Sequence, residues 1–192
     1  MLGVCRRHLG DWQGSVAAAE KALALENTPY TRSNLALSCL LRGQNGDVEQ
    51  AKTLATQALA EAKEGEEKAQ AQAVLGAALC LANDRDGALA QLRAASEKQG
   101  EDPWNSLFQG RCMVGSGGLE ETLASFKKAE ALAAADRTDS KLMERIAKEA
   151  KEGEKLARKA HRDLAIASSL KRRSEQAAPP ESESPKTAES PK

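Results

Sequence analysis

Apolar and small residues recur in this chain in one frame that repeats about every 35 residues. The frame consists of a Leu-Gly pair, a turn, and then alanines and bulky apolar residues at three- and four-residue spacings. Its clearest copy contains Leu75, Gly76, Leu79, Ala88, Leu92 and Ala95. The other copies contain Leu2, Gly3, Trp12, Ala19 and Ala22; Leu35, Ala36, Ala51, Ala55 and Ala58; and Gly110, Met113, Leu123, Phe126 and Ala129. A repeat of this length predicts stacked helix pairs, and such arrays usually bind other molecules rather than catalyse reactions.

Turn and helix-capping residues divide the frame into four predicted units of two helices each. The units begin at Met1, Pro29, Glu66 and Asp102, and their turns lie at residues 10–11, 43–46, 83–84 and 115–118. In the fourth unit Asp102 fits a helix N-cap and Pro103 fits the first helical turn. The second helix of this unit ends near Ala135, so the repeat domain is predicted to cover residues 1–136.

The composition agrees with an all-α chain that carries no overall charge. Of the 192 residues, 29% are charged and 3% are aromatic, and alanine and leucine, which favour helices, dominate the apolar set. Lys and Arg number 28, as do Asp and Glu, which removes any general attraction to nucleic acid. No apolar run approaches the roughly 20 residues that span a bilayer, so no membrane association is predicted. Charged residues interrupt the N-terminus, which argues against a secretion signal.

The four cysteines follow the repeat and not a metal-binding pattern. Cys5, Cys39, Cys80 and Cys112 each fall in the first helix of a different unit, at nearly equivalent places. They form no local pairs of the kind that a zinc site needs, and disulfides would need an oxidising compartment. We therefore interpret all four as small buried residues, and we predict a cytoplasmic protein, with the nucleus as the alternative.

This pattern resembles the tetratricopeptide repeat (TPR), whose units carry Leu-Gly in the first helix and small alanines in the second. The third and first units carry the resemblance best, through Leu75, Gly76, Asn83, Ala88, Leu92 and Ala95 and through Leu2, Gly3, Gly10, Trp12 and Ala22. Ala36, Gln109 and Thr122 depart from the family's preferences. The resemblance covers roughly residues 1–135. It implies a right-handed α-solenoid of antiparallel helix pairs that serves as a protein–protein interaction scaffold or adaptor.

The first unit begins late in this frame. Met1 immediately precedes the Leu2-Gly3 pair, whereas the first helix of a TPR unit begins well before that pair. We expect the chain to be a fragment of a longer repeat array, with an unusual start as the alternative.

The first helices of stacked pairs line a concave groove, and their residues form the candidate partner-binding set. Its members are mostly apolar: Tyr30, Asn34, Leu37, Ala77, Trp104, Leu107 and Arg111. Such a groove suits an extended apolar peptide or an amphipathic helix. Tyr30 and Trp104 are the expected anchors, because large aromatic side chains concentrate binding energy. The alternative is that Trp104 and Leu107 only pack between units three and four.

Some TPR proteins are adaptors that hold the C-terminal carboxylate of a heat-shock chaperone with Lys, Asn and Arg side chains. Asn34 lies where one such Asn is expected. The other clamp positions hold Val4, Gln70 and Val74, so the cations are absent. We therefore predict a protein partner that is not bound through a carboxylate clamp.

The histidines and the glycine-rich turns form no recognisable catalytic site. His8 and His161 lie in different regions, and Cys5 with His8 has no second pair to complete a zinc site. Residues 115–118 connect two helices, unlike a phosphate-binding loop that follows a strand. We predict a protein that is not an enzyme and that uses no cofactor or metal.

Residues 137–176 are predicted to form one long helix, or two close ones, with one apolar face. The apolar positions follow three- and four-residue steps: Leu142, Ile146, Ala150, Gly153, Leu156, Ala157, Ala160, Leu164, Ala167 and Leu170. This helix is expected to cap the fourth unit, as terminal repeats require. Alternatively, residues 158–173 dock a partner helix or form a coiled coil, which would make the chain a constitutive subunit of a larger complex.

The basic cluster Lys171-Arg172-Arg173 ends this helix, where it complements the helix dipole. Nuclear import or a weak ribonucleoprotein association is the alternative. Residues 177–192 are rich in Pro, Ser, Glu and Lys and are predicted to be disordered. Ser184 and Ser190 precede Pro-Lys and resemble sites of proline-directed kinases, so both are candidate phosphorylation sites.

Overall fold

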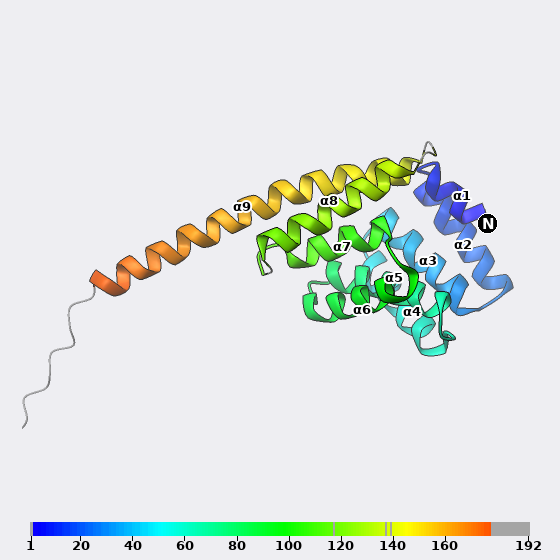
Figure 1. The fold of residues 1–192 in the computed structure, drawn as a ribbon. Helices are drawn as coiled ribbons and strands as arrows, with labels where there is room; N and C mark the ends of the chain where they lie inside the picture. Colours follow the sequence, from blue (N-terminus) through cyan, green and yellow to red (C-terminus); the bar gives the residue numbers. More distant parts are fainter. Residues whose placement is uncertain (1, 117, 137, 139, 178–192) are drawn as a thin grey trace, which may run out of the picture.

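A computed structural model describes residues 2–116, 118–136, 138 and 140–177. Within these residues the chain forms α-helices and no strand (Figure 1). The helices are α1 (Leu2–His8), α2 (Trp12–Leu25), α3 (Pro29–Arg42), α4 (Asp47–Glu61), α5 (Glu66–Leu81), α6 (Arg85–Gln99), α7 (Pro103–Met113), α8 (Leu119–Ala135) and α9 (Lys141–Ala177). The predicted all-α class is therefore confirmed, and Ser184 and Ser190 lie outside the described residues.

The first eight helices form four sequential pairs, α1–α2, α3–α4, α5–α6 and α7–α8, and each pair packs on the next (Figure 1). Consecutive first helices also contact one another: α1 contacts α3, α3 contacts α5, and α5 contacts α7. This arrangement confirms the predicted solenoid of TPR-like helix pairs. The first helices form one layer and the second helices the other, so the first helices line the inner side of the stack.

Local capping explains where the helices begin and end. Asp102 accepts a hydrogen bond from the backbone N–H of Asn105 at 2.8 Å, which confirms its role as the N-cap of α7. Gly43 ends α3 in the left-handed region with φ 70°, where glycine has no steric cost. Asn83 takes φ 66° in the α5–α6 turn, and Asn is one of the few side chains that tolerate this region.

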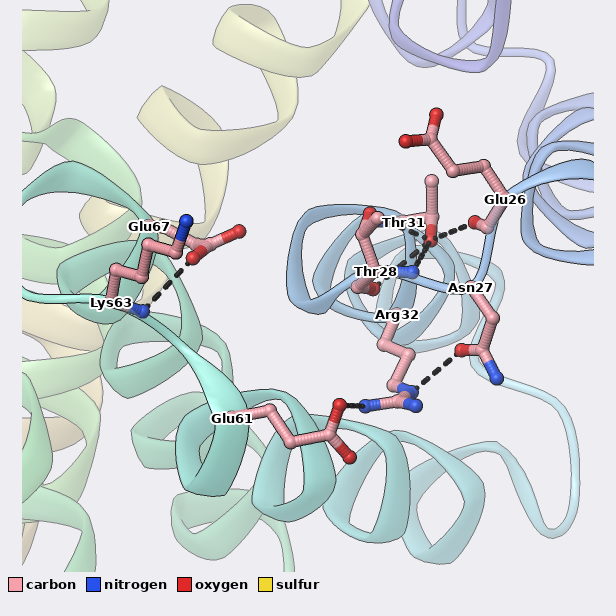
Figure 2. Close-up of polar contacts among 8 residues, drawn as sticks. All are labelled: Glu26, Asn27, Thr28, Thr31, Arg32, Glu61, Lys63 and Glu67. Atoms are coloured by element: carbon pink, nitrogen blue, oxygen red, sulfur yellow. Dashed lines mark hydrogen bonds and ion pairs between the residues drawn. The ribbon is translucent and has the colours of Figure 1, made fainter.

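The connection between the first two units is held by a network of polar contacts at the start of α3 (Figure 2). Thr28 and Thr31 form a reciprocal capping box, and Pro29 occupies the first turn. Arg32 Nε donates to Asn27 Oδ1 at 2.8 Å, and its Nη1 pairs with Glu61 Oε2 at 2.7 Å. The Arg32 side chain therefore ties the α2–α3 connection to the end of α4.

Small residues lie where the paired helices approach most closely. A Cβ atom at Gly76 in α5 would lie 2.6 Å from Leu92 Cγ and 3.1 Å from the Ala88 carbonyl oxygen in α6. The equivalent second-helix alanines Ala58, Ala95 and Ala129 are buried. Ala22 is exposed, in contrast to these equivalents. Gly3 near the start of the seven-residue helix α1 already lies against Ser15 and Ala19, so α1 does not extend over Ala22.

Helix α9 packs on α8 and α7, which are the neighbours that the first helix of a further unit would have. The ring of Phe126 in α8 lies between Gly110 of α7 and Gly153 of α9. Helix α9 runs back along α8, and its distal half extends beyond the start of α8 (Figure 1). The predicted long C-terminal helix is confirmed.

The start of α9 also reaches the first unit, a contact that the sequence did not predict. His8 Nδ1 and Ser140 Oγ share a hydrogen bond of 2.8 Å. Arg145 Nη1 donates to the Leu41 carbonyl oxygen at 2.6 Å, and its guanidinium lies 5.2 Å from the centre of the Trp12 ring. These contacts join the last helix of the stack to α1, α2 and α3.

The interpretation of the cysteines as four small buried residues is wrong for Cys5, and Cys80 is only half-buried, whereas Cys112 is 1% exposed. Cys39 is buried, but Cys5 is exposed. Cys80 of α5 and Cys112 of α7 form a disulfide, with their Cα atoms 5.7 Å apart. They pair because the neighbouring first helices α5 and α7 pack side by side in the stack.

Candidate functional site

A cavity of about 800 Å³ lies between the first helices and α9. Its apolar lining comes from the C-terminal half of α3, from α4, α5, α7, α8 and α9, and includes Leu40, Val48, Leu81, Trp104, Phe108, Phe126 and Leu156. Its charged lining consists of Arg85, Arg111, Arg145, Glu149 and Glu152. The cavity therefore lies on the inner side of the helix stack, and α9 forms one of its walls.

Two aromatic rings of α7 form the apolar centre of the wall. Their centroids are 4.6 Å apart and the ring planes are tilted by 47°. Asp102 and Pro103 start the helix, which places Trp104 in its first turn and Phe108 one turn later on the same face. The buried Nε1–H of Trp104 has no hydrogen-bond acceptor among the residues that the structure describes.

Arginines dominate the charge of the cavity. Glu149 of α9 accepts from Arg111 Nη1 at 2.9 Å and from Arg145 Nε at 2.8 Å, so one carboxylate serves two guanidinium groups. The Arg111 guanidinium also lies 5.1 Å from the centre of the Phe108 ring. Arg85 Nη1 donates to the Val114 carbonyl oxygen at 3.0 Å and contacts no carboxylate among the described residues. Three arginines therefore face two glutamates, which leaves the cavity wall with an excess of positive charge.

The structure separates the seven candidate groove residues into different environments. Trp104 and Arg111 line the cavity. Ala77 and Leu107 are 0% exposed and offer no surface to a partner in this conformation. Leu37 is half-buried and packs against the core, and Tyr30 is 51% exposed but does not line the cavity.

Asn34 is engaged within the protein. Its Oδ1 accepts from Arg7 Nη2 at 2.9 Å, and its Nδ2 donates to the Tyr30 carbonyl oxygen at 3.0 Å. Arg7 is itself buried and also donates to Ser38 Oγ at 3.0 Å. Burial lowers the pKa of the Arg7 guanidinium from its ordinary value. Arg7 and Asn34 thus belong to the seam between α1 and α3.

Sequence reasoning missed the cavity residues of α9, above all Arg145, Glu149 and Leu156. It predicted that this helix caps the fourth unit or, alternatively, that residues 158–173 dock a partner helix, and it did not place its first half at a cavity. Gly153 is the signal that could have found them, because a glycine within a charged helix indicates a close approach to another element. Here that element is the ring of Phe126.

Other kinds of site have no counterpart in the part of the chain that the structure describes. No group of three or more His, Cys, Asp or Glu side chains there could hold a metal ion. Among the same residues, no helix combines the length and apolar character needed to cross a membrane.

Comparisons with solved structures support the fold, whereas comparisons of the sequence with protein families and curated proteins find no match. No protein-family model matches the chain, and no curated protein sequence matches it. A crystal structure of MamA matches with 16% identity and a TM-score of 0.50, over 86% of this chain and 98% of MamA. A second MamA structure has 17% identity, a TM-score of 0.48 and coverages of 86% and 91%. YrrB, described as a TPR protein with an unusual peptide-binding site, has 19% identity, a TM-score of 0.47 and coverages of 83% and 88%.

At this level of identity the first MamA match shows a shared fold alone. Together with the four helix pairs and their Leu-Gly and alanine frame, it identifies the architecture as a TPR-like helical solenoid. A fold of this kind is typically a scaffold for binding proteins or peptides.

Proposed function

We propose that this chain is a non-catalytic protein-interaction scaffold that binds an extended peptide or an amphipathic helix in the cavity between its first helices and α9. The observation that carries the proposal is the cavity itself, with its paired aromatic rings and apolar lining. Its volume of about 800 Å³ accommodates several side chains of a peptide.

The lining also indicates how a peptide would be held. Trp104, Phe108 and Leu156 supply apolar contact area, and Trp104 offers the kind of large ring that concentrates binding energy. Arg85, whose charge no carboxylate balances among the described residues, suits an acidic side chain at the edge of the cavity. The partner is therefore expected to combine apolar side chains with at least one negative charge.

The proposed location is the cytoplasm, as the composition suggests. The Cys80–Cys112 disulfide bears on this proposal, because such bonds are rare in reducing compartments. In the cytoplasm the two residues would exist mainly as thiols. Differential alkylation of the protein isolated from its cell, followed by mass spectrometry, measures their state; a pair that is fully oxidised in the cell contradicts a cytoplasmic location.

The proposed function is tested with peptides selected on the full chain from an unbiased library. Leu81, the last residue of α5, lines the cavity and is 37% exposed, so Leu81→Asp changes the cavity without removing a core residue. Leu25 is the matched control, because it is the last residue of α2, is 89% exposed and does not line the cavity.

We expect Leu81→Asp to weaken binding of the selected peptides by roughly tenfold or more, since it places a charge against an apolar ligand surface. Leu25→Asp should bind as the unmodified chain does. The binding constants are measured by isothermal titration calorimetry. Equal affinities for the unmodified chain and Leu81→Asp would exclude the cavity as the binding site.

A further inference from the structure

The distal half of α9 carries large apolar side chains that remain more than half exposed in the described structure. Leu156, Leu164, Ile166 and Leu170 are 56%, 51%, 58% and 58% exposed. Scattered exposed leucines are ordinary, but a contiguous apolar surface on one helix indicates an interaction site. The question is therefore whether these side chains share one face.

Helical geometry places them on one face. At about 100° per residue, Ile166, Leu170, Leu156 and Leu164 fall within an arc of about 160°. Ala160 and Ala167 lie between them on the same arc, which also holds the charged residues Lys159, Asp163 and Lys171. This set, which we call the distal apolar face, consists of Leu156, Ala160, Leu164, Ile166, Ala167 and Leu170. It extends for roughly 21 Å along the helix, at 1.5 Å per residue.

The distal apolar face is continuous with the cavity. Glu149, Glu152 and Leu156 line the cavity, and at about 100° per residue they lie on the same side of α9 as Ala167 and Leu170. A chain segment that occupies the cavity beside Trp104 can therefore continue along α9 past the start of α8, where Ala167 and Leu170 offer further apolar contacts.

One edge of the distal apolar face is strongly basic. Lys155, Lys159, Arg162 and Arg173 lie beside Ile166 on the helix surface, at about 100° per residue. All four are exposed, and none forms an ion pair within the described structure. Asp163 is the only acidic residue between residues 155 and 173. The surface thus combines an apolar centre with an uncompensated positive edge, whereas the chain as a whole has no net charge.

Charge and shape select among the possible occupants. A second copy would bring two positive edges together, which like-charge repulsion disfavours. Nucleic acid would gain little from an apolar face on a helix without aromatic residues for base stacking. A flat bilayer could not follow the face into the cavity. A partner helix with apolar and acidic positions matches both the apolar centre and the basic edge.

We infer that the distal apolar face of α9 binds an acidic amphipathic helix of a partner protein, about four turns long, which continues from the cavity along α9. The inference rests on the proposed function and names the chemistry of its partner. Leucine-type side chains of the partner helix pack on Leu164, Ile166 and Leu170, and its Glu or Asp residues pair with Lys159 and Arg162.

The test uses the full chain and two fluorescein-labelled 18-residue helical peptides of identical leucine pattern. One has Glu at the positions that flank the leucines, and its twin has Lys there. Fluorescence anisotropy measures the binding of each peptide to four chains. These are the unmodified chain, Ile166→Asp/Leu170→Asp, the charge reversal Lys159→Glu/Arg162→Glu, and the control Ala165→Asp, which is exposed on the opposite side of the helix. Circular dichroism verifies that every variant keeps its helix content.

The expected result is binding of the Glu peptide, weakened roughly tenfold or more by Ile166→Asp/Leu170→Asp and less than about twofold by Ala165→Asp. The charge reversal should transfer the preference to the Lys peptide. No binding of the Glu peptide, or equal binding by Ile166→Asp/Leu170→Asp, overturns the inference. Two other results would also overturn the inference: self-association of the chain that Ile166→Asp/Leu170→Asp abolishes, or binding of the chain to vesicles of phosphatidylserine and phosphatidylcholine that the same variant abolishes. If Leu81→Asp still weakens the library-selected peptides in that case, the proposed function stands without the extension along α9.

Discussion

The ring of Phe126 holds α7, α8 and α9 together, and its two glycine neighbours allow a quantitative test of that packing. The ring is fully buried. A Cβ atom at Gly110 would lie 2.9 Å from ring carbons, and a Cβ atom at Gly153 would lie closer still. Because a glycine flanks the ring on each side, the ring cannot move away from one without meeting the other. We therefore predict that Gly153→Ala destabilises the protein, although alanine favours helices over glycine.

The expected magnitude follows from two opposing effects. Overpacking of a closed core costs about 1–3 kcal/mol, and the severe overlap at Gly153 places the cost in the upper part of this range, about 2–3 kcal/mol. Replacement of glycine by alanine within a helix returns up to about 1 kcal/mol. The net loss should be about 1–2 kcal/mol, which lowers the melting temperature by roughly 2–8 °C in a chain of this size. Phe126→Ala, which removes the ring, should cost more, about 3–5 kcal/mol.

Urea unfolding followed by circular dichroism measures these differences. Phe126→Leu should partly rescue Gly153→Ala, because the smaller side chain leaves room for the added methyl group, and the double-mutant cycle should show coupling of about 1 kcal/mol. Gly118→Ala is the control, since a Cβ atom at Gly118 meets nothing within 4 Å. A Gly153→Ala protein that is as stable as the unmodified chain, or coupling near zero, would refute the placement of α9 against Phe126.

Three further predictions address other parts of the structure. Arg42 donates to the buried Asp47 carboxylate and holds its pKa below the usual range, so the stability it provides exists at neutral pH and is lost as the pH falls through that lowered pKa. At pH 7 the free energy of unfolding of Asp47→Asn should be about 1–3 kcal/mol lower than that of the unmodified chain. Between pH 5 and pH 2, urea titrations should show a smaller loss of stability for Asp47→Asn than for the unmodified chain, and parallel pH profiles would contradict this. Burial raises the pKa of the Cys39 thiol to about 11, so iodoacetamide at pH 8 should modify the exposed Cys5 and leave Cys39 intact in the folded protein; equal modification by mass spectrometry would contradict the burial. Trp104→Ala should weaken the library-selected peptides roughly tenfold in calorimetry while the far-UV spectrum stays helical, and cooperative destabilisation without loss of affinity would assign Trp104 to the core.

Local signals in the sequence predicted the helix pairs and most of their ends. Gly43 takes the left-handed conformation that ends α3, and Asp102 caps α7, because each feature depends on only a few neighbouring residues. The Leu-Gly and alanine frame predicted the close contact between α5 and α6. At position 76 a side chain would collide with Leu92, so glycine fits there.

The contact between α9 and the first unit could not be predicted in this way. The hydrogen bond of His8 with Ser140 joins the two ends of the stack, so it depends on the curvature of all four helix pairs. That curvature is the accumulated result of small rotations between neighbouring pairs. The pattern of apolar residues specifies each crossing only roughly. The cavity residues Arg145 and Glu149 depend on that same curvature, and so they too were missed.

The candidate groove residues show a related limit. Periodicity placed Ala77, Leu107 and Trp104 on first helices, but it did not separate positions that face a neighbouring helix from those that face the cavity. Ala77 and Leu107 are buried between helices, whereas Trp104 lines the cavity. The Cys80–Cys112 disulfide was not predicted, because the two cysteines occupy different places in the repeat frame, four residues after Gly76 and two residues after Gly110.

The central claim, that a partner binds on the inner side of the solenoid against α9, is tested most directly by hydrogen–deuterium exchange of the full chain with and without a saturating library-selected peptide. We predict slower exchange of backbone amides in α5, α7 and the half of α9 that lines the cavity, with α2 and the C-terminal halves of α4 and α6 unchanged. Protection confined to α2 and the C-terminal halves of α4 and α6 would place the partner on the outer side of the stack and contradict the proposal.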